Sequence, residues 1–467
     1  MAEKYDVVII GAGIGGLCAG ALLAKEGKKV VLLEGRKGLG GRAVSIPIKG
    51  IYTELGFHGI VKNGHLVHVL EAVKQDIPMI PLDPNFVIYH DGKFFEVPGE
   101  INDFANFEYI PQKDRAELMD ILRLIHDTTI EEAEDYDLMG WGDWIKAHTS
   151  SRDIYDFLAL LANIPMTEEY TSNISAGEAL RCVGAGLREK GWSIYPRDGA
   201  MNVIHEALAK VITDAGGSVR TNVWVREIVV KDSVVQGVSA ESADALVKIE
   251  APIVVSNLPV WDIFKLTNQE NFPRWFVDRV RFNEEHSQIA PSASLGLTCV
   301  SSKPLNNYKT AVLVSCKEPI NSTGPSYVRW LSQPTNWIHG MGKDKHLFQY
   351  GPVLPRSYVA LCRERPSIYE KEINNLWNEI FSMHPHFKKE DILWKGDGII
   401  PSTDCSGKFP GNAWRQRIDV QAPNVRGLYF VGDTVRGWGV AMDTAASSAI
   451  LCTEKILKKS TGISLII

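Results

Sequence analysis

The sequence has no pairing pattern among its cysteines. Only seven cysteines are scattered through 467 residues, their number is odd, and no two of them form a C-x-x-C pair. This scatter argues against a disulfide framework, a zinc site and a redox-active dithiol. His65 and His68 lie three residues apart on an expected helix, but no third ligand accompanies them. The sequence therefore predicts no metal site.

The chain also lacks the features of nucleic-acid-binding, secreted and membrane-spanning proteins. A formal net charge of −6 gives no reason to expect a nucleic-acid partner. No basic segment followed by an apolar run precedes the first expected strand, so no signal peptide is predicted and the cytoplasm is the expected compartment. Residues 5–24 are nearly uncharged and long enough to cross a bilayer, but Asp6 opens this run and glycines interrupt it. A membrane-spanning helix is not predicted there.

A strand, a glycine-rich loop, a helix and a second strand follow one another near the N-terminus. Residues 7–10 predict a strand buried on both faces, residues 17–26 a helix and residues 29–33 a second strand. The loop before the helix fits G-x-G-x-x-G; its glycines are Gly11, Gly13, Gly15 and Gly16. Glycines in this loop permit the tight turn, the approach of a pyrophosphate and close packing of the helix on the sheet.

Glu34 ends the second strand, about 20 residues beyond the glycines, where a carboxylate accepts hydrogen bonds from a ribose diol. The same carboxylate would repel a 2′-phosphate, and the helix N-terminus would attract a pyrophosphate. The pattern therefore predicts a dinucleotide site that disfavours NADP. A tight turn without a ligand is the competing interpretation, and it leaves the ordered second strand and its terminal acid unexplained.

Residues 35–42 add a more specific signal. They resemble the R-x-G-G-R segment of FAD-dependent oxidoreductases of the amine oxidase and phytoene desaturase superfamily. In that family the glycine pair passes under the flavin diphosphate and the arginine neutralises phosphate charge, as a buried dianion requires. The resemblance implies that FAD is the cofactor. It adds these cofactor residues: Gly35, Arg36, Gly40, Gly41 and Arg42.

The C-terminal part resembles the second flavin motif of the same superfamily. Residues 425–433 read as a β-branched and aromatic strand that ends in Gly432 and Asp433, and a small-residue helix is expected from about Val440. The resemblance implies that Gly432 and Asp433 approach the ribityl chain. The helix N-terminus would face the pyrimidine edge of the flavin, where negative charge accumulates on reduction. Gly439, Val440 and Met442 are the cofactor residues expected there.

Two middle segments also resemble the superfamily. Residues 195–201 resemble its Y-P-x-G-G turn, with Asp198 in place of the first glycine, and residues 251–259 resemble the strand that ends the middle FAD segment. Val225 matches a residue that contacts the adenine through its backbone. Residues 260–395 contain no second G-x-G-x-x-G, so no second Rossmann unit for NAD(P)H is predicted.

The resulting fold class is α/β, with a discontinuous Rossmann-like FAD-binding domain of the glutathione-reductase type and an interleaved α+β substrate domain. Residues 1–80, 190–265 and 395–467 are expected to form the FAD-binding domain. Residues 81–189 and 266–394 are expected to form the substrate domain, with helices at 114–129, 138–165 and 368–383 and strand-like runs that include residues 359–362.

The resemblance predicts an enzyme in which FAD removes or transfers a hydride on an apolar small molecule, as in phytoene desaturase-like dehydrogenases. His58 and Trp438 are the candidate residues for lining the reactive part of the flavin, in shaping roles. A flavin amine oxidase or a protoporphyrinogen oxidase is an alternative enzyme. A lipid-binding protein like the GDP-dissociation inhibitors is the non-enzymatic alternative.

The partners expected from this interpretation are an apolar substrate and an external electron acceptor, which could be oxygen, a quinone or a carrier protein. Nucleic acid is not among them. The aromatic and aliphatic residues of 138–165 are expected to face a core, or else to form a peripheral membrane contact through which a lipid enters.

Overall fold

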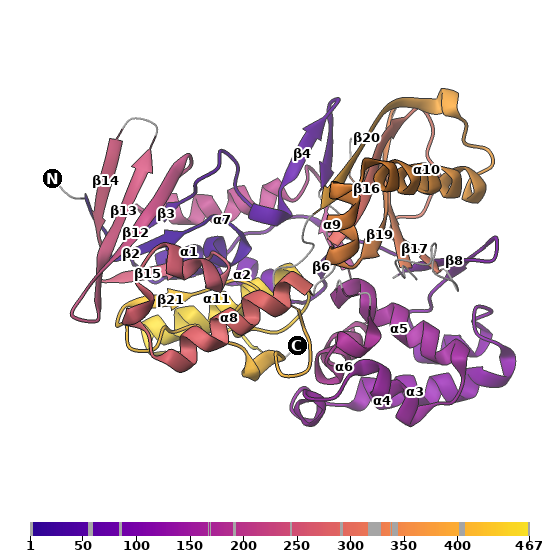
Figure 1. The fold of residues 1–467 in the computed structure, drawn as a ribbon, viewed down its shortest axis with the longest axis horizontal. Helices are drawn as coiled ribbons and strands as arrows, with labels where there is room; N and C mark the ends of the chain where they lie inside the picture. Colours follow the sequence, from indigo (N-terminus) through magenta and orange to yellow (C-terminus); the bar gives the residue numbers. More distant parts are fainter. Residues whose placement is uncertain are drawn as a thin grey trace.

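A five-stranded parallel sheet joins three distant parts of the chain (Figure 1). The computed structural model describes residues 3–54, 59–83, 86–166, 168, 170–189, 193–242, 245–289, 293–315, 328–336, 338, 344–400 and 407–465. In spatial order the strands of this sheet are β11 (Ser218–Arg220), β3 (Val30–Leu33), β2 (Val7–Ile10), β15 (Ile253–Ser256) and β21 (Leu428–Phe430). Every pairing within it is parallel. The carboxyl ends of its strands therefore meet at one edge.

Helices cover this sheet because its strands are apolar on both faces. The β2 and β3 strands, VVII and VVLL, are buried along their whole length. The helix after β2, α1 (Ile14–Lys25), packs against α7 (Asn202–Asp214) and the C-terminal helix α11 (Met442–Leu457). A four-stranded sheet lies beside this unit and consists of β1 (Glu3–Lys4), β14 (Ala245–Glu250), β13 (Val234–Ser242) and β12 (Val223–Lys231).

A seven-stranded sheet forms the second large unit of the molecule. Its strands in spatial order are β20 (Ile392–Ile400), β16 (Ala293–Ser301), β19 (His346–Leu354), β18 (Val328–Ser332), β17 (Val312–Ser315), β8 (Val87–His90) and β9 (Lys93–Glu96). Successive residues of β8 and β17 point into two different hydrophobic cores. Ile88 and Leu313 pack with one group of helices, and Val87 and Val312 pack with another. This is the two-residue period of a strand with both faces covered.

The helices on one face of the seven-stranded sheet contain most of the apolar residues of the segment 114–165, for which the sequence predicts helices. These helices are α3 (Arg115–Asp127), α4 (Trp141–His148), α5 (Arg152–Met166) and α6 (Ala176–Arg188), which Figure 1 shows as one group. Trp141, Trp144 and Phe157 are buried in their core, and the two indole rings stack at 4.8 Å. These side chains therefore face a core rather than a surface. Among the described residues, no helix has the length and apolar character needed to cross a membrane.

The other face of the sheet is covered by α9 (Arg356–Glu364) and α10 (Pro366–Met383). The prediction of a strand at residues 359–362 is wrong, because these residues lie in α9. Tyr358, Val359 and Cys362 are its buried residues, which is the spacing of a helix face. A run of four apolar residues fits the period of a strand as well as that of a helix, so the sequence alone did not decide between the two.

Two smaller sheets complete the described part of the chain. The hairpin of β4 (Ser45–Ile48) and β5 (Ile51–Glu54) follows the first glycine-rich segments, and β6 (Ile60–Val61), β10 (Ser193–Pro196) and β7 (Met79–Pro81) form a three-stranded sheet. The helix α2 (His65–Ala72) follows β6, and α8 (Arg274–Ile289) precedes β16. The expected domain boundaries remain predictions; β20 spans the one placed between residues 394 and 395.

A buried histidine after α10 makes the stability of the fold sensitive to acid. His384 is 2% exposed, its ring lies 5.8 Å from that of Phe94, and burial, with His386 nearby, lowers its pKa to about 4. The unfolded chain therefore binds a proton first as the pH falls below the ordinary histidine value. We expect about 3 kcal/mol of unfolding free energy to be lost between about pH 6.5 and pH 4.

Denaturant unfolding at pH 7 and at pH 4 measures this loss of unfolding free energy. In His384→Phe the difference in unfolding free energy between the two pH values should shrink by about 3 kcal/mol. His126→Asn is the control, because that side chain is 40% exposed on α3. An acid dependence in His384→Phe equal to that of the parent protein would contradict this assignment.

Candidate functional site

The glycine-rich loop between β2 and α1 lies at the carboxyl edge of the parallel sheet. Gly11 has a φ of +94°, and a Cβ atom on Gly16 would lie 2.2 Å from the Gly11 carbonyl oxygen, so neither position accepts a side chain. The helix begins at Ile14, and within the described chain no side chain caps its first turn and no acidic residue lies in it. Its free N–H groups and its dipole therefore favour an anion at this end.

Glu34 ties the end of β3 to this loop. Its carboxylate oxygens accept hydrogen bonds from the backbone N–H groups of Ala12 and Arg36, each at 2.8 Å. The same residue donates its own N–H to the Arg220 carbonyl of β11 at 2.8 Å. The acid therefore fixes the shape of the loop as well as presenting charge beside it.

The segment 35–42 runs alongside the first loop. The Gly40 N–H donates to the Ala12 carbonyl at 2.7 Å, and Gly40 has a φ of +102°. A Cβ atom on Gly41 would meet only the backbone of Gly13, at 3.3 Å from its Cα, and one on Gly40 would lie 2.2 Å from the His205 ring. A Cβ atom on Gly35 would likewise collide with the exposed indole of Trp224. The two glycine-rich segments therefore form a backbone-walled cradle.

The C-terminal motif closes this cradle from the other side. Gly432 follows β21, has a φ of +114° and donates its N–H to the Ser448 hydroxyl of α11 at 2.8 Å. The Asp433 carboxylate pairs with the Arg42 guanidinium at 2.7 Å across 391 residues of sequence. A Cβ atom on Gly15 would lie 2.9 Å from the Gly432 nitrogen, so the two ends of the chain are in contact at this point.

Asn257 is a central residue of this site that the sequence interpretation did not assign. It follows β15, between β2 and β21 in the sheet, and its N–H donates to the Ile10 carbonyl at 2.8 Å. Its side-chain amide lies 2.6–2.7 Å from the Cβ positions of Gly13 and Gly15 and 3.2 Å from that of Gly432. The signal was available, because parallel strands bring their carboxyl ends to one edge, and a polar residue directly after a buried strand lies there.

The start of α11 is the second expected contact of the cofactor. The helix begins at Met442, after Gly439 and Val440, with Ala441 at a φ of +47°. Asp443, in the first turn, is buried, and its carboxylate accepts hydrogen bonds from Leu66 N at 3.0 Å and contacts His65 Nδ1 at 2.7 Å. A negative charge therefore lies inside the first turn and ties α11 to α2.

The two candidate catalytic residues remain predictions. Trp438 is 2% exposed; its indole N–H donates to the Leu465 carbonyl at 2.6 Å, and its ring meets the His65 ring edge-on at 4.8 Å. His58 lies outside the described residues, which resume at 59. Val225 is half-buried on β12 opposite Ala240, and β12 joins the site where the Val223 N–H donates to the Glu34 carbonyl at 2.9 Å.

A second cluster of buried polar side chains lies where the β4–β5 hairpin, β10 and the seven-stranded sheet meet. Glu54 accepts a hydrogen bond from the Ser45 hydroxyl at 3.2 Å and one from the Tyr195 hydroxyl, and its carbonyl accepts one from the Gln349 side chain at 2.5 Å. Burial, followed by the nearby Glu54 charge, raises the pKa of Tyr195, so this phenol stays protonated. The cluster connects elements that the sequence assigned to different domains.

A buried ion network joins the helical group to the C-terminal motif. Glu178 of α6 accepts a hydrogen bond from Trp414 N at 2.8 Å and lies 3.7 Å from the Arg417 guanidinium. Arg417 donates to the Asn412 and Asp433 carbonyls at 3.0 and 3.4 Å. On the other side, Arg181 pairs with Asp137 at 2.8 Å and with Glu178 at 3.4 Å. Burial raises the pKa of Asp137 although Arg181 opposes this shift.

The donor set of the cradle fits the dinucleotide that the sequence predicts. An open helix N-terminus, glycine backbones and the Arg42 guanidinium suit a diphosphate, and Glu34 lies at the end of β3 where a ribose is expected. The carboxylate of Asp433 is held by Arg42 at the opposite side. The described residues contain no group of histidine, cysteine or acidic side chains suited to a metal ion.

Comparison with known proteins gives a family and a fold. A family model described as flavin containing amine oxidoreductase matches residues 14–283. Human all-trans-retinol 13,14-reductase is 27% identical over 300 residues, which cover 56% of this chain and 48% of that protein. Phytoene desaturase (neurosporene-forming) from Rhodobacter capsulatus is 25% identical over 311 residues, covering 57% and 55% respectively. The chain spans about half the length of the curated relatives it matches.

A solved structure of an oxidoreductase from Methanosarcina mazei resembles the whole chain. The TM-score is 0.72 at 19% identity, over 98% of this chain and 100% of that one, which shows a shared fold. Together with the parallel sheet, this likeness confirms the predicted fold class.

Proposed function

Because this chain belongs to the family of flavin-containing amine oxidoreductases, as the motifs at both of its ends predicted, we propose that it is an FAD-dependent oxidoreductase acting on an apolar small molecule. One observation supports this most directly. The loop of β2 and α1 and the segment after β21 meet around Asn257, and Arg42 pairs with Asp433 across them. Backbone donors, a cation and an open helix N-terminus thereby converge on one place.

The side chains and backbone groups of this place have distinct roles. Gly13, Gly41 and the first turn of α1 would hold the diphosphate, Glu34 the ribose, and Asp433 a ribityl hydroxyl. When bound, FAD supplies the two-electron chemistry by accepting or giving a hydride. Glu34 and Asn257 keep the loops in the shape that binding needs.

The substrate class follows from the relatives. The two curated relatives described above are named as acting on a retinoid and on a carotenoid precursor, which are apolar polyenes. We therefore propose an isoprenoid-like polyene as the substrate of this chain. Whether the net reaction is oxidation, reduction or isomerisation decides whether an acceptor such as oxygen, a quinone or a carrier protein is needed. A peripheral membrane contact remains a prediction.

Anaerobic reduction of the purified protein by a panel of isoprenoids, amines and porphyrinogens tests this function. If the reaction is an oxidation, we expect a polyene, and not amines or porphyrinogens, to bleach the flavin absorbance. If it is a reduction, a polyene should instead restore the absorbance of flavin that was reduced beforehand. Bleaching by an amine or a porphyrinogen would favour an amine oxidase or a protoporphyrinogen oxidase instead. A protein that is colourless as purified and stays colourless after incubation with FAD would favour a non-catalytic lipid-binding protein.

The variant Glu34→Arg tests the cofactor assignment itself. It removes the acceptor of two backbone N–H groups and adds a cation beside them. Flavin should bind about tenfold to a hundredfold more weakly, measured by fluorescence titration of the apoprotein. Glu206→Arg makes the same charge change on the exposed side of α7 and should leave the affinity unchanged. Equal affinities for the two variants would refute the assignment.

A further inference from the structure

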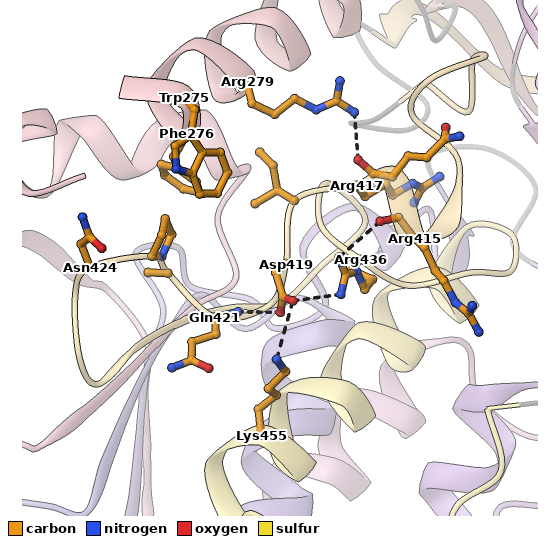
Figure 2. A pocket seen from close by; sticks show the side chains of 14 residues that line it. Trp275, Phe276, Arg279, Arg415, Arg417, Asp419, Gln421, Asn424, Arg436 and Lys455 are labelled. Carbon is orange, nitrogen blue, oxygen red and sulfur yellow. Dashed lines mark hydrogen bonds and ion pairs between the residues drawn. The ribbon is translucent and has the colours of Figure 1, made fainter. Parts of the chain in front are cut away.

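A groove with a volume of about 810 Å³ lies on the outer side of the parallel sheet, away from the cradle (Figure 2). Its walls are α8, the segment before β21 and the last turn of α11. Residues 420–422 pair with the outer edge of β21, where Phe430 N donates to the Val420 carbonyl at 2.8 Å, so the groove lies beyond this edge of the sheet. Lys455 lies thirteen residues after Met442, which is about 20 Å along α11 from the expected flavin contact.

The groove carries a surplus of positive charge. Of the described residues that line it, five are cationic and Asp419 is the one acid. Asp419 is shared by Arg436 at 2.9 Å and Lys455 at 3.6 Å. Two further lining cations, Arg415 and Arg417, are matched by acids behind the wall, Glu134 at 3.1 Å and Glu178 at 3.7 Å.

Arg279 carries the least compensated charge of the groove. Its Nη2 donates to the Gly411 and Gln416 carbonyls at 2.6 and 3.0 Å and to the Asn412 amide oxygen at 3.4 Å, and among the described residues Arg279 forms no ion pair with a carboxylate. Burial lowers the pKa of this guanidinium, but the group remains charged at neutral pH. The buried Nε of Arg436 likewise has no acceptor among the described residues. Arg279 therefore adds a positive charge without a carboxylate partner among the described residues, whereas Arg436 is already held by Asp419 at 2.9 Å and donates to the Arg415 carbonyl at 3.2 Å.

The opposite end of the groove is aromatic and neutral. Figure 2 shows Trp275, Phe276 and Asn424 at one end and Arg279, Arg415 and Arg436 at the other. The Trp275 indole is 64% exposed although its neighbour Phe276 is buried against the Phe430 ring at 6.0 Å. The exposed Trp275 indole and the side-chain amide of Asn424 suit a planar heterocyclic ligand. Such a ligand can stack one face on the indole and form hydrogen bonds along its own edge.

We propose that this groove binds a nucleoside phosphate, with its base on Trp275 and its phosphate between Lys455, Arg436 and Arg279. An aromatic end and a cationic end within one cavity of this size match a ligand that is aromatic at one end and anionic at the other. The shared chemistry could come from a free mononucleotide or from the nucleotide half of a dinucleotide. Arg417 lines the groove and donates to the Asp433 carbonyl of the cradle at 3.4 Å, but no lining residue of the groove belongs to the cradle itself, so the proposal does not rest on the proposed redox function.

Calorimetric titration of the protein with AMP tests this proposal, with FAD present in excess so that the cradle is not the site observed. AMP should bind with a Kd below about 1 mM, and adenosine and inorganic phosphate, each of which has one half of the ligand, should bind at least about tenfold more weakly. NAD⁺ is the second probe. A Kd for NAD⁺ lower than that for AMP identifies the dinucleotide as the source, and a higher one identifies the mononucleotide.

Variants of two exposed side chains, Trp275 and Lys455, test which residues bind AMP in the groove. Trp275→Ala should weaken AMP binding at least about tenfold, and Lys455→Gln should weaken it several-fold and reduce its dependence on salt. Lys248→Gln, on the exposed strand β14, is the matched control and should bind like the parent protein. The proposal is overturned if AMP and NAD⁺ both fail to bind, or if Trp275→Ala and Lys455→Gln, melting at the parent temperature, bind AMP as the parent does.

Discussion

Replacing Gly15 with valine is expected to abolish the retention of flavin. A Cβ atom at this position would lie 2.9 Å from the Gly432 nitrogen and 2.6 Å from the Asn257 amide oxygen, and the first of these is backbone that has no rotamer to change. The valine methyl groups would reach further still, so the N-terminal loop and the C-terminal motif would be forced apart. We expect flavin affinity to fall at least about a hundredfold, measured as flavin bound per chain after purification.

Gly38→Val is the control for this variant. Gly38 lies in the neighbouring glycine-rich segment and is exposed, and a Cβ atom there would meet no described residue within 4 Å. It should therefore bind flavin as the parent protein does. A Gly15→Val protein that is as yellow as Gly38→Val would show that contact between the two chain ends does not hold the cofactor.

Replacing Arg417 with methionine is expected to cause the largest loss of stability. The side chain is fully buried, and its removal leaves Arg181, which is already paired with Asp137, as the remaining cation of Glu178 among the described residues. An uncompensated buried charge costs about 3–5 kcal/mol. Because Arg417 also donates to the Asp433 carbonyl, we expect weaker flavin binding to accompany the loss of stability.

A double-mutant cycle separates the charge effect from the loss of packing. Glu178→Leu alone should destabilise about as much as Arg417→Met, whereas the double variant keeps the neutral Arg181–Asp137 pair and should recover at least about 1 kcal/mol relative to additivity. Denaturant unfolding supplies the free energies. Lys210→Met removes an ion pair whose side chains are 67% and 62% exposed and should cost less than about 1 kcal/mol. Strictly additive effects of the two buried substitutions would contradict the network.

The parts of the site that the sequence could predict are those in which one short segment determines the geometry. The run from β2 to Glu34 combines a buried strand, positive-φ glycines and a helix start, and each step follows from local physics. The fold class followed from the same segments, because parallel strands separated by helices have few arrangements.

Residues whose roles depend on distant partners could not be predicted. Asn257 matters because β15 lies between β2 and β21, and Arg417 matters because α6 brings Glu178 against it. Neither pairing is encoded within one segment. The strand expected at residues 359–362 failed for a related reason: a short apolar run takes the conformation that its packing selects.

The pairing of Arg42 with Asp433 also sets the earliest point at which a newly made chain can complete the cradle. Synthesis proceeds from the N-terminus, so the first glycine loop leaves the ribosome long before β21, the last strand of its sheet, has been translated. Contacts of such long sequence separation form late, because loop closure has to precede them. The cradle is therefore complete only after β21, the last strand of this sheet, has been made and has paired with β15.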